Sequence, residues 1–142
     1  MQIVIVNEES PYLKEVMKLA RANAGTLGFL PKGAFINYAT HSQILVAIDG
    51  KKNVLGYLLY GTSRKKMLAY IVHLCVKQSQ RGKGVARALF DELKKITKDA
   101  YRGIRVHCRR DYDASRFWPI LGFRAISEMP GRSKQGTTLT IW

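Results

Sequence analysis

Acidic residues, cysteines and long apolar runs are all scarce in this sequence of 142 residues. No apolar stretch approaches the roughly 20 residues that a membrane-spanning helix needs, and the first residues lack the basic and apolar regions of a signal peptide. We therefore expect a soluble, cytoplasmic protein that makes no membrane contact. The two cysteines, Cys75 and Cys108, lie in predicted strands, where buried and reduced thiols are commoner than a disulfide or a nucleophile. No group of Cys and His has the spacing of a metal site, so no metal is expected.

The shortage of acidic residues produces a strongly basic protein. Asp and Glu number 10 against 24 Lys and Arg, which gives a formal net charge of +14. Residues 1–60 hold 6 basic and 4 acidic side chains, a net +2, whereas residues 61–142 hold 18 and 6, a net +12. Such a surface attracts acidic partners or nucleic acid electrostatically, although many basic faces are only solvated. RNA or another polyanion is therefore a candidate partner of the second half.

The order of apolar patterns predicts one α+β domain over residues 1–142, without repeats, linkers or low-complexity segments. Alternating or β-branched runs predict strands at 2–6, 44–48, 54–60, 68–76, 104–108, 124–128 and 137–142. Helical spacing predicts helices at 11–23, 32–38, 85–98 and 114–121. The apolar stripe of the first helix consists of Leu13, Val16, Met17 and Ala20. The stripe of the third helix consists of Val85, Ala88, Leu89, Leu93 and Ile96.

The most informative segment is QRGKGVA at 80–86, which connects the strand at 68–76 to the amphipathic helix that begins at Val85. Gly82 and Gly84 let the backbone approach a ligand closely, and the first N–H groups of a helix have no partner within it. Positive charge is supplied by Arg81, Lys83 and Arg87. Together these features predict a cradle for a polyanionic ligand that contains phosphate.

The spacing of this segment excludes two common nucleotide-binding motifs. A Walker loop needs G-x-x-x-x-G-K-[ST], which is absent, and the dinucleotide motif G-x-G-x-x-G fails because Arg87 stands at its last glycine. The segment instead resembles the signature of the GNAT superfamily of N-acetyltransferases, which is met by Arg81, Gly84 and Ala86. By this resemblance, acetyl-CoA is the acetyl donor and its pyrophosphate occupies the loop. The implied cofactor-binding positions are Leu74, Val76, Arg81, Gly82, Lys83, Gly84, Val85, Ala86 and Arg87.

Two further segments match the superfamily in the same order. The strand before the loop ends in Leu74-Cys75-Val76, and a pair at Gly122-Phe123 follows a further strand and helix. The resemblance implies a mixed, mostly antiparallel sheet of six to seven strands with about four helices, splayed between the fourth and fifth strands. It also implies that the backbone at Leu74 and Val76 contacts the pantetheine arm inside the splay.

An acetyltransferase needs a group that accepts the amine proton, and Tyr70 and His73 are the candidate catalytic residues. Relatives often place Glu or His where Tyr70 stands, whereas tyrosine is a poor base at neutral pH. Histidine titrates in a more suitable range, but strict alternation puts His73 on the face opposite Tyr70, unless the bulge common in the superfamily's fourth strand redirects it. His107 on the next strand and a chain of water molecules are alternative bases, and core packing is the alternative role for His73.

The position of the general acid departs from the superfamily pattern. Where many relatives have Asn, Ala and Tyr before the Gly-Phe pair, this sequence has Asp111, Ala114 and Trp118. An indole cannot act as a proton-donating acid, so Trp118 is interpreted either as a packing residue or as the sign of a domain that binds CoA without efficient turnover. If the step needs an acid, Tyr112 or solvent can supply it.

Three functions from different classes fit these observations. The first is an N-acetyltransferase that transfers the acetyl group of acetyl-CoA to a primary amine of a small molecule or protein by direct attack. The second is an acetyltransferase whose amine is held by nucleic acid, such as aminoacyl-tRNA, as in toxin members of the superfamily. The third is a non-catalytic module that binds CoA or nucleic acid. Homodimers are common in the superfamily, so self-association is a further expectation.

Overall fold

A computed structural model describes residues 1–109, 116–130 and 138–141. It contains seven strands, four α-helices and two short 3₁₀ helices, η1 and η3, within those ranges. In chain order these are β1 (Gln2–Val6), α1 (Tyr12–Ala22), α2 (Ala24–Leu27), α3 (Lys32–Thr40), β2 (Ile44–Ile48), β3 (Val54–Ser63), β4 (Leu68–Val76), η1 (Gln78–Gln80), α4 (Val85–Thr97), β5 (Gly103–Arg109), η3 (Trp118–Leu121), β6 (Ser127–Pro130) and β7 (Thr138–Ile141).

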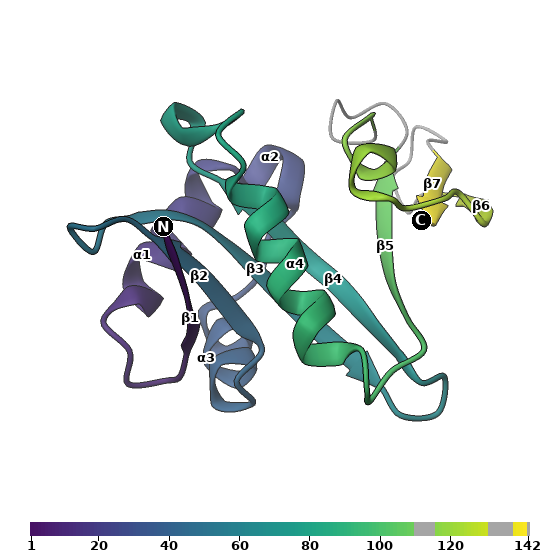
Figure 1. Ribbon diagram of the computed structural model, residues 1–142, viewed down its shortest axis with the longest axis horizontal. Helices are drawn as coiled ribbons and strands as arrows, with labels where there is room; N and C mark the ends of the chain where they lie inside the picture. Colours follow the sequence, from purple (N-terminus) through teal and green to yellow (C-terminus); the bar gives the residue numbers. More distant parts are fainter. Residues whose placement is uncertain (110–115, 131–137, 142) are drawn as a thin grey trace.

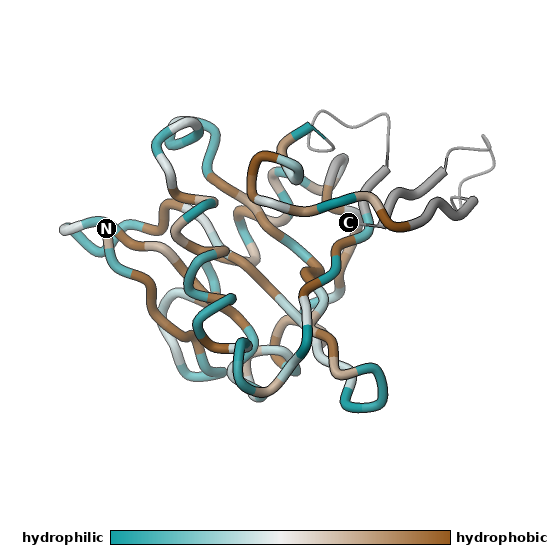
Figure 2. Tube along the Cα trace, turned by 45° about the vertical axis from the view of Figure 1, so that its right-hand side comes forward, coloured by the Kyte–Doolittle hydropathy of each residue, from teal (hydrophilic) through white to brown (hydrophobic). Residues whose placement is uncertain are grey.

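The strands pair in the order β1-β2-β3-β4-β5-β7-β6, and all neighbours are antiparallel except β4 and β5. Helix α4 crosses one face of the sheet, and α1 and α3 lie on the other (Figure 1). Apolar residues follow the central strands, and polar residues gather on the turns (Figure 2). This arrangement confirms the predicted α+β fold with a mixed, mostly antiparallel sheet.

Each face of the sheet has its own buried cluster. The cluster under α4, called the α4-side core, includes Leu45, Leu58, Ile71, Leu89, Phe90, Leu93 and Val106. The cluster under the other helices, called the α1–α3-side core, includes Val16, Phe35, Val46, Tyr57, Leu59 and Cys75. Because these two clusters divide the strand residues between the faces, they also show on which side of the sheet each side chain lies.

The apolar stripe of α1 is confirmed, since all four of its predicted residues are buried. The stripe of α4 is wrong at two positions: Ala88 is only half-buried and Ile96 is 38% exposed, whereas Phe90 and Thr97 are buried. The buried residues Val85, Leu89, Leu93 and Thr97 lie four apart. Each step of four residues advances the contact by about 40° around a helix, so the buried face turns away from Ile96 in the last turn.

Strands β4 and β5 pair only at their beginnings. Their parallel register runs from Leu68 opposite Gly103 to Ile71 opposite Val106 and then ends. Beyond this point β5 pairs with β7 instead, from His107 onward, and the two strands diverge (Figure 1). The structure therefore confirms the predicted splay between the fourth and fifth strands, and it leaves one edge of β4 without a strand partner over residues 72–76.

A β-bulge interrupts β4 at Val72. Leu59 pairs with His73 and Tyr60 pairs with Ile71, so Val72 has no partner on β3. As a result Ile71 lies in the α4-side core while the ring of His73 packs against Phe35 on the opposite face. Strict alternation, which grouped Tyr70 with Leu74 and Val76, is wrong because the extra residue reverses the order of the faces. The exception expected from the resemblance, a bulge in the fourth strand that redirects His73, is confirmed.

The C-terminal part of the sheet differs from the prediction in its boundaries. Strand β6 spans Ser127–Pro130 instead of 124–128, because its partner β7 reaches only these residues. The described part of the helix predicted at 114–121 is the 3₁₀ helix η3, which ends at Gly122 with a φ of +105°. The positions Asp111, Tyr112 and Ala114 lie outside the described residues.

Within the described ranges, no helix combines the length and apolarity that a membrane crossing requires.

Candidate functional site

The free edge of β4 exposes backbone groups at Leu74 and Val76. Lys77 donates its N–H to the Leu55 carbonyl of β3 at 2.9 Å, and in an antiparallel ladder successive residues alternate between pointing toward and away from the partner. The N–H and C=O groups of Val76 and Leu74 therefore point away from β3, toward the splay. Their side chains pack against the α4-side core. The geometry agrees with a role of these two residues that depends on their backbone.

The free edge leads directly into the glycine loop at 80–86. Gly82 and Gly84 have φ values of +78° and +84°, a conformation that residues with a Cβ rarely adopt, and nothing lies within 4 Å of the place where a Cβ would be. The first helical hydrogen bond of α4 runs from Ala88 N–H to Gly84 C=O at 3.0 Å. The N–H groups of residues 85–87 therefore precede the helical ladder, as an anion cradle requires.

The loop is anchored to the sheet at its start and at its end. Val85 is buried in the α4-side core, and Ala86 is half-buried. Beneath them, a Cβ at Gly56 on β3 would lie 2.7 Å from the Cys75 carbonyl oxygen and 3.2 Å from a methyl group of Val85. Only glycine permits this close approach of β3 to the end of β4. This role of Gly56 could not be predicted from the sequence, because the contact joins segments that are distant along the chain.

Three basic residues of the loop stand in different settings. Arg81 donates from Nε to the Val76 carbonyl at 3.1 Å and from a terminal nitrogen to Asn23 Oδ1 at 3.1 Å. Arg87 donates to the Ile120 carbonyl at 2.8 Å, which ties α4 to η3. The side chain of Lys83 is exposed. Arg81 thus joins the loop both to the free edge of β4 and to the end of α1, a link to Asn23 that the sequence did not indicate.

His73 is buried, with 4% of its surface exposed, and is held on two sides. The Tyr57 hydroxyl hydrogen-bonds Nδ1 at 3.0 Å, and the Leu27 backbone also hydrogen-bonds the ring. Phe35 and Tyr57 pack against the imidazole edge to face, each with ring centroids 6.1 Å apart. Burial lowers the pKa of His73, although the Leu27 hydrogen bond opposes this shift. The ring therefore connects β3 and β4 to the last residue of α2.

Tyr70 forms a second aromatic pair, with His107 of β5. The two rings are stacked, with centroids 6.4 Å apart and planes inclined by 20°. The Tyr70 side chain is half-buried and His107 is exposed. Burial lowers the pKa of His107, and the charges of Arg105 and Lys66 lower it further. The imidazole of His107 is therefore neutral at pH 7 and able to accept a proton, at the point where β4 and β5 separate.

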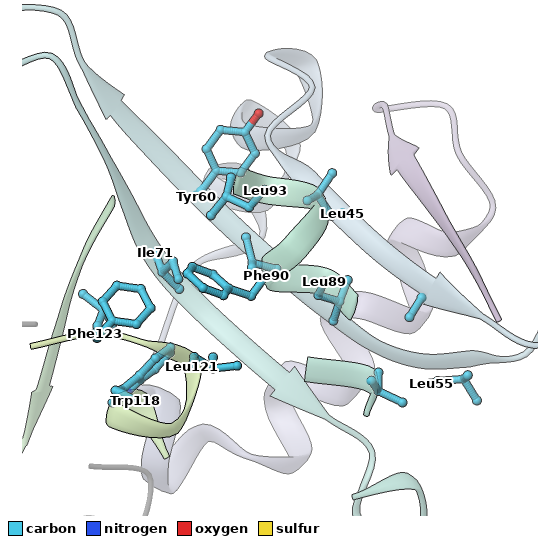
Figure 3. Close-up of a cluster of buried hydrophobic side chains, with 14 residues drawn as sticks. Leu45, Leu55, Tyr60, Ile71, Leu89, Phe90, Leu93, Trp118, Leu121 and Phe123 are labelled. Atoms are coloured by element: carbon cyan, nitrogen blue, oxygen red, sulfur yellow. The ribbon is translucent and has the colours of Figure 1, made fainter. Parts of the chain in front are cut away.

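Trp118 is a packing residue, as one of its two interpretations predicted. Its side chain is 6% exposed and lies in the α4-side core, edge to face with Phe117 and Phe123 at centroid distances of 5.7 and 5.5 Å. Figure 3 shows it beside Leu121 and Phe123. The indole Nε1 is buried and has no hydrogen-bond partner among the described residues. The same cluster contains Ile71, the last residue of β4 that pairs with β5, so Trp118 packs near the point where the two strands separate.

Cys75 is buried on the α1–α3 side of β4, and burial raises the pKa of its thiol to about 11, although Arg81 opposes this shift. The thiol is therefore protonated at neutral pH and is not an activated nucleophile. No group of His, Cys, Asp and Glu in the described ranges has a geometry that holds a metal ion. The chemistry of this site thus depends on the free strand edge, the glycine loop and the two histidines.

A pocket of about 240 Å³ lies between α1, α2 and α3, on the side of the sheet that carries His73. Phe35 lines this pocket and also contacts His73. The pocket wall is apolar at Met17, Ala20 and Leu30, and Arg21 and Lys32 supply charge at it. Phe29, on the loop before α3, is 84% exposed.

Comparison with known proteins places this geometry in a family context. A family model described as an acetyltransferase (GNAT) domain matches residues 31–140. Ard1 from Thermoplasma volcanium is similar in structure, with a TM-score of 0.82 and 18% identity, over 99% of this chain and 93% of that one. Arabidopsis thaliana NAA60 in complex with a bisubstrate analogue has a TM-score of 0.80 and 18% identity, over 99% and 94% of the two chains.

An aminoglycoside 6'-N-acetyltransferase complexed with coenzyme A also shares the fold, with a TM-score of 0.80 and 13% identity, over 99% of this chain and 94% of that one. A search of curated protein sequences finds no significant match. At these identities, the structural likeness establishes the fold and leaves the acceptor of this protein open.

Proposed function

The chain belongs to the GNAT acetyltransferase family, whose acetyl donor is acetyl-CoA, and we propose that it transfers this acetyl group to a primary amine of a small molecule or protein by direct attack. The observation that carries the proposal is the continuity of the free edge of β4 with the glycine loop before α4. The free edge offers backbone groups that no neighbouring strand uses, and the glycine loop offers an anion cradle. An elongated ligand with an amide-containing arm and a phosphate end matches both.

The residues present fit acetyl-CoA. The backbone N–H groups of residues 82–87, with Lys83 and Arg87 nearby, would hold the pyrophosphate, and the open space at Gly82 and Gly84 admits it. The outward N–H and C=O groups of Leu74 and Val76 would bind the amide-containing arm. When bound, acetyl-CoA supplies an activated acetyl thioester.

His107 is the side chain best placed to accept the amine proton. It is neutral at pH 7, it is exposed, and it stands where β4 and β5 separate. Tyr70 stacks on it and restricts the orientation of its ring. A neutral histidine accepts the proton that the acceptor nitrogen must lose in order to attack more readily than a phenol, which becomes a base only when it is ionised at high pH. Tyr70 is accordingly a positioning residue in this proposal.

His73 is proposed as a positioning residue rather than the base. Its ring is buried and engaged by Tyr57 and by the Leu27 backbone, so an acceptor amine has little access to it. Through Leu27 it fixes the end of α2 on the α1–α3 side of the sheet. His73 and His107 thus lie on the same face of the sheet but have different roles in this proposal, because an acceptor can reach only the exposed ring of His107.

The fold does not specify the chemical class of the acceptor. The solved relatives include a complex bound to a Gag peptide and CoA, and an N-acetylglutamate synthase complexed with coenzyme A and N-acetyl-glutamate, so this fold serves very different acceptors. An amine held by RNA stays a prediction that rests on the net charge of +12 in residues 61–142. It is tested by binding of a short RNA at low and moderate salt, where a phosphate contact weakens steeply with added salt.

The experiment that tests the proposed function is isothermal titration of the protein with acetyl-CoA, followed by thiol release with a panel of small amines and peptides. Binding of acetyl-CoA and amine-dependent release of CoA support the proposal. Binding without transfer to any amine indicates a non-catalytic CoA module, and failure to bind acetyl-CoA contradicts the assignment of the glycine loop.

A further inference from the structure

Three side chains leave the same face of the sheet where β4 and β5 separate. Gly61 of β3 faces α3, because a Cβ there would lie 3.8 Å from the Tyr38 ring, and Gly61 pairs with Tyr70. Tyr70 in turn pairs with Arg105 in the parallel register and stacks on His107. Cross-strand partners share a face of a sheet, so Tyr70, Arg105 and His107 lie together on the α1–α3 side.

Arg105 is unusual among the basic residues because it is half-buried and the described residues provide it with neither a hydrogen bond nor an ion pair. Lys66, on the loop between β3 and β4, adds a second charge here. Arg102 secures this loop beside β5 by donating its backbone N–H to the Met67 carbonyl at 2.8 Å and its Nε to the Lys66 carbonyl at 3.0 Å. Both cations act on His107 electrostatically.

The described parts of β3, β4 and β5 offer these cations no acidic partner. Residues 51–90 and 100–110, which include β3, β4 and β5, contain no Asp or Glu. The ion pair found in the described ranges, Lys94 with Asp91, lies on the exposed surface of α4. A partly buried cation without a counter-charge is destabilising, so a site built this way favours an anion supplied from outside.

We propose that Arg105 and Lys66 form an anion subsite for the acceptor, so that preferred acceptors carry a compact oxyanion, a carboxylate or phosphate, close to the reactive amine. The inference rests on the proposed function, because it assigns the acceptor side of the same site. A compact oxyanion fits better than a nucleic-acid backbone, since the half-buried cation is a single arginine beside the candidate base. Arginine also suits carboxylate and phosphate geometry through paired N–H donors.

The subsite also connects acceptor binding to the base. In the free protein, the positive charges of Arg105 and Lys66 contribute to the low pKa of His107. An anion bound between them offsets this effect and raises the pKa of His107 while the acceptor is present. The imidazole then takes up the amine proton more readily as the nitrogen forms its bond to the acetyl carbon. The C–S bond of the thioester breaks in the same transfer, and CoA leaves as a thiolate that solvent protonates.

The test compares acceptors that differ only in the anion. Two pairs of short peptides carry Glu or Gln, and phosphoserine or serine, as their second residue, and a third pair is lysine and lysinamide. The measurement is kcat/KM for CoA release by the wild-type protein, Arg105→Gln, Lys66→Gln and Lys95→Gln. Lys95, in the last turn of α4 on the opposite face, is the matched control for loss of one charge. Thermal unfolding verifies that each variant is folded.

We expect wild-type kcat/KM to be at least about tenfold higher for the anionic member of a pair, as loss of a charge-assisted hydrogen bond implies. Arg105→Gln should abolish this preference, Lys66→Gln should reduce it, and Lys95→Gln should retain it. The carboxylate and phosphate pairs distinguish the two sources of the oxyanion. Equal rates within every pair, or a preference that survives in Arg105→Gln, overturn the subsite and leave the proposed function standing.

Two other outcomes are also decisive. Transfer that occurs only to an aminoacylated RNA, and to none of the six acceptors, overturns the compact-anion subsite in favour of a nucleic-acid acceptor. Absence of transfer to any acceptor, with acetyl-CoA bound, overturns both the subsite and the proposed function.

Discussion

Substitution of Gly84 tests the cofactor loop most directly, because the structure separates the effect of charge from the effect of folding. A Cβ at Gly84 meets nothing within 4 Å, so a new side chain strains only the backbone, whose φ is +84°. Asn and Asp both tolerate this left-handed conformation, at a cost below the roughly 1–2 kcal/mol of other residues. Gly84→Asn and Gly84→Asp should therefore both fold, with similar melting temperatures.

The two variants should differ in their affinity for CoA. A carboxylate about 6 Å from a phosphate charge near a protein surface is repelled by about 3 kcal/mol, which corresponds to a loss of affinity of about 100-fold. Isothermal titration with CoA should show this loss for Gly84→Asp relative to Gly84→Asn. Because salt screens exposed charges, the gap between the variants should narrow as the ionic strength rises. Equal affinities of the two folded variants would refute the placement of the pyrophosphate at this loop.

Four further substitutions, with Gly33→Ala as a control, test the candidate base, the support of His73 and the close contact at Gly56. His107→Gln should lower kcat by about 10²- to 10⁴-fold and should remove the acidic limb of the pH profile of kcat/KM. In the wild type this limb should lie below the ordinary histidine pKa of about 6.5, because the pKa of His107 is lowered. An unchanged pH profile would exclude His107 as the base. Tyr57→Phe should lower the free energy of unfolding in urea by about 1–3 kcal/mol, since Nδ1 of buried His73 loses its partner. Because burial lowers the pKa of His73, the unfolded chain takes up a proton at a higher pH than the folded protein does, and the free energy of unfolding should fall as the pH drops below about 6.5. His73→Gln should weaken this pH dependence. An equal pH dependence in His73→Gln would contradict the assignment of the effect to His73. Gly56→Ala should destabilise the protein and weaken CoA binding, because its Cβ would lie 2.7 Å from a β4 carbonyl oxygen, whereas Gly33→Ala, with nothing within 4 Å, should leave CoA binding unchanged.

The backbone of β4 and of the glycine loop could be predicted because its signals are local. The bounds of β4 were predicted correctly, since a β-branched run ends at basic and polar residues. Glycine at positions 82 and 84 indicated a tight turn, and both residues have the positive φ values that glycine allows. The α4 stripe failed at Ile96, because the curvature of the buried face depends on how the helix crosses the sheet.

The acceptor side was less predictable because it depends on pairing between distant strands. The bulge at Val72 exists only relative to β3, and its effect is to bring Tyr70 and His73 to one face. The partner of His73 is Tyr57, sixteen residues earlier, and the partner of Arg81 is Asn23, fifty-eight residues earlier. No spacing rule within one segment indicates contacts of this kind.

The two halves of the site lie on different sides of one sheet, and this separation explains why the splay matters. The glycine loop, α4 and Trp118 belong to the α4 side, whereas Tyr70 and His107 face the α1–α3 side. A continuous sheet would separate an acceptor amine from a thioester bound on its far side. Where β4 and β5 diverge after Ile71, the barrier ends, and the free edge of β4 is reached from both faces. An amine held beside His107, as proposed, would reach the free edge of β4 through this opening.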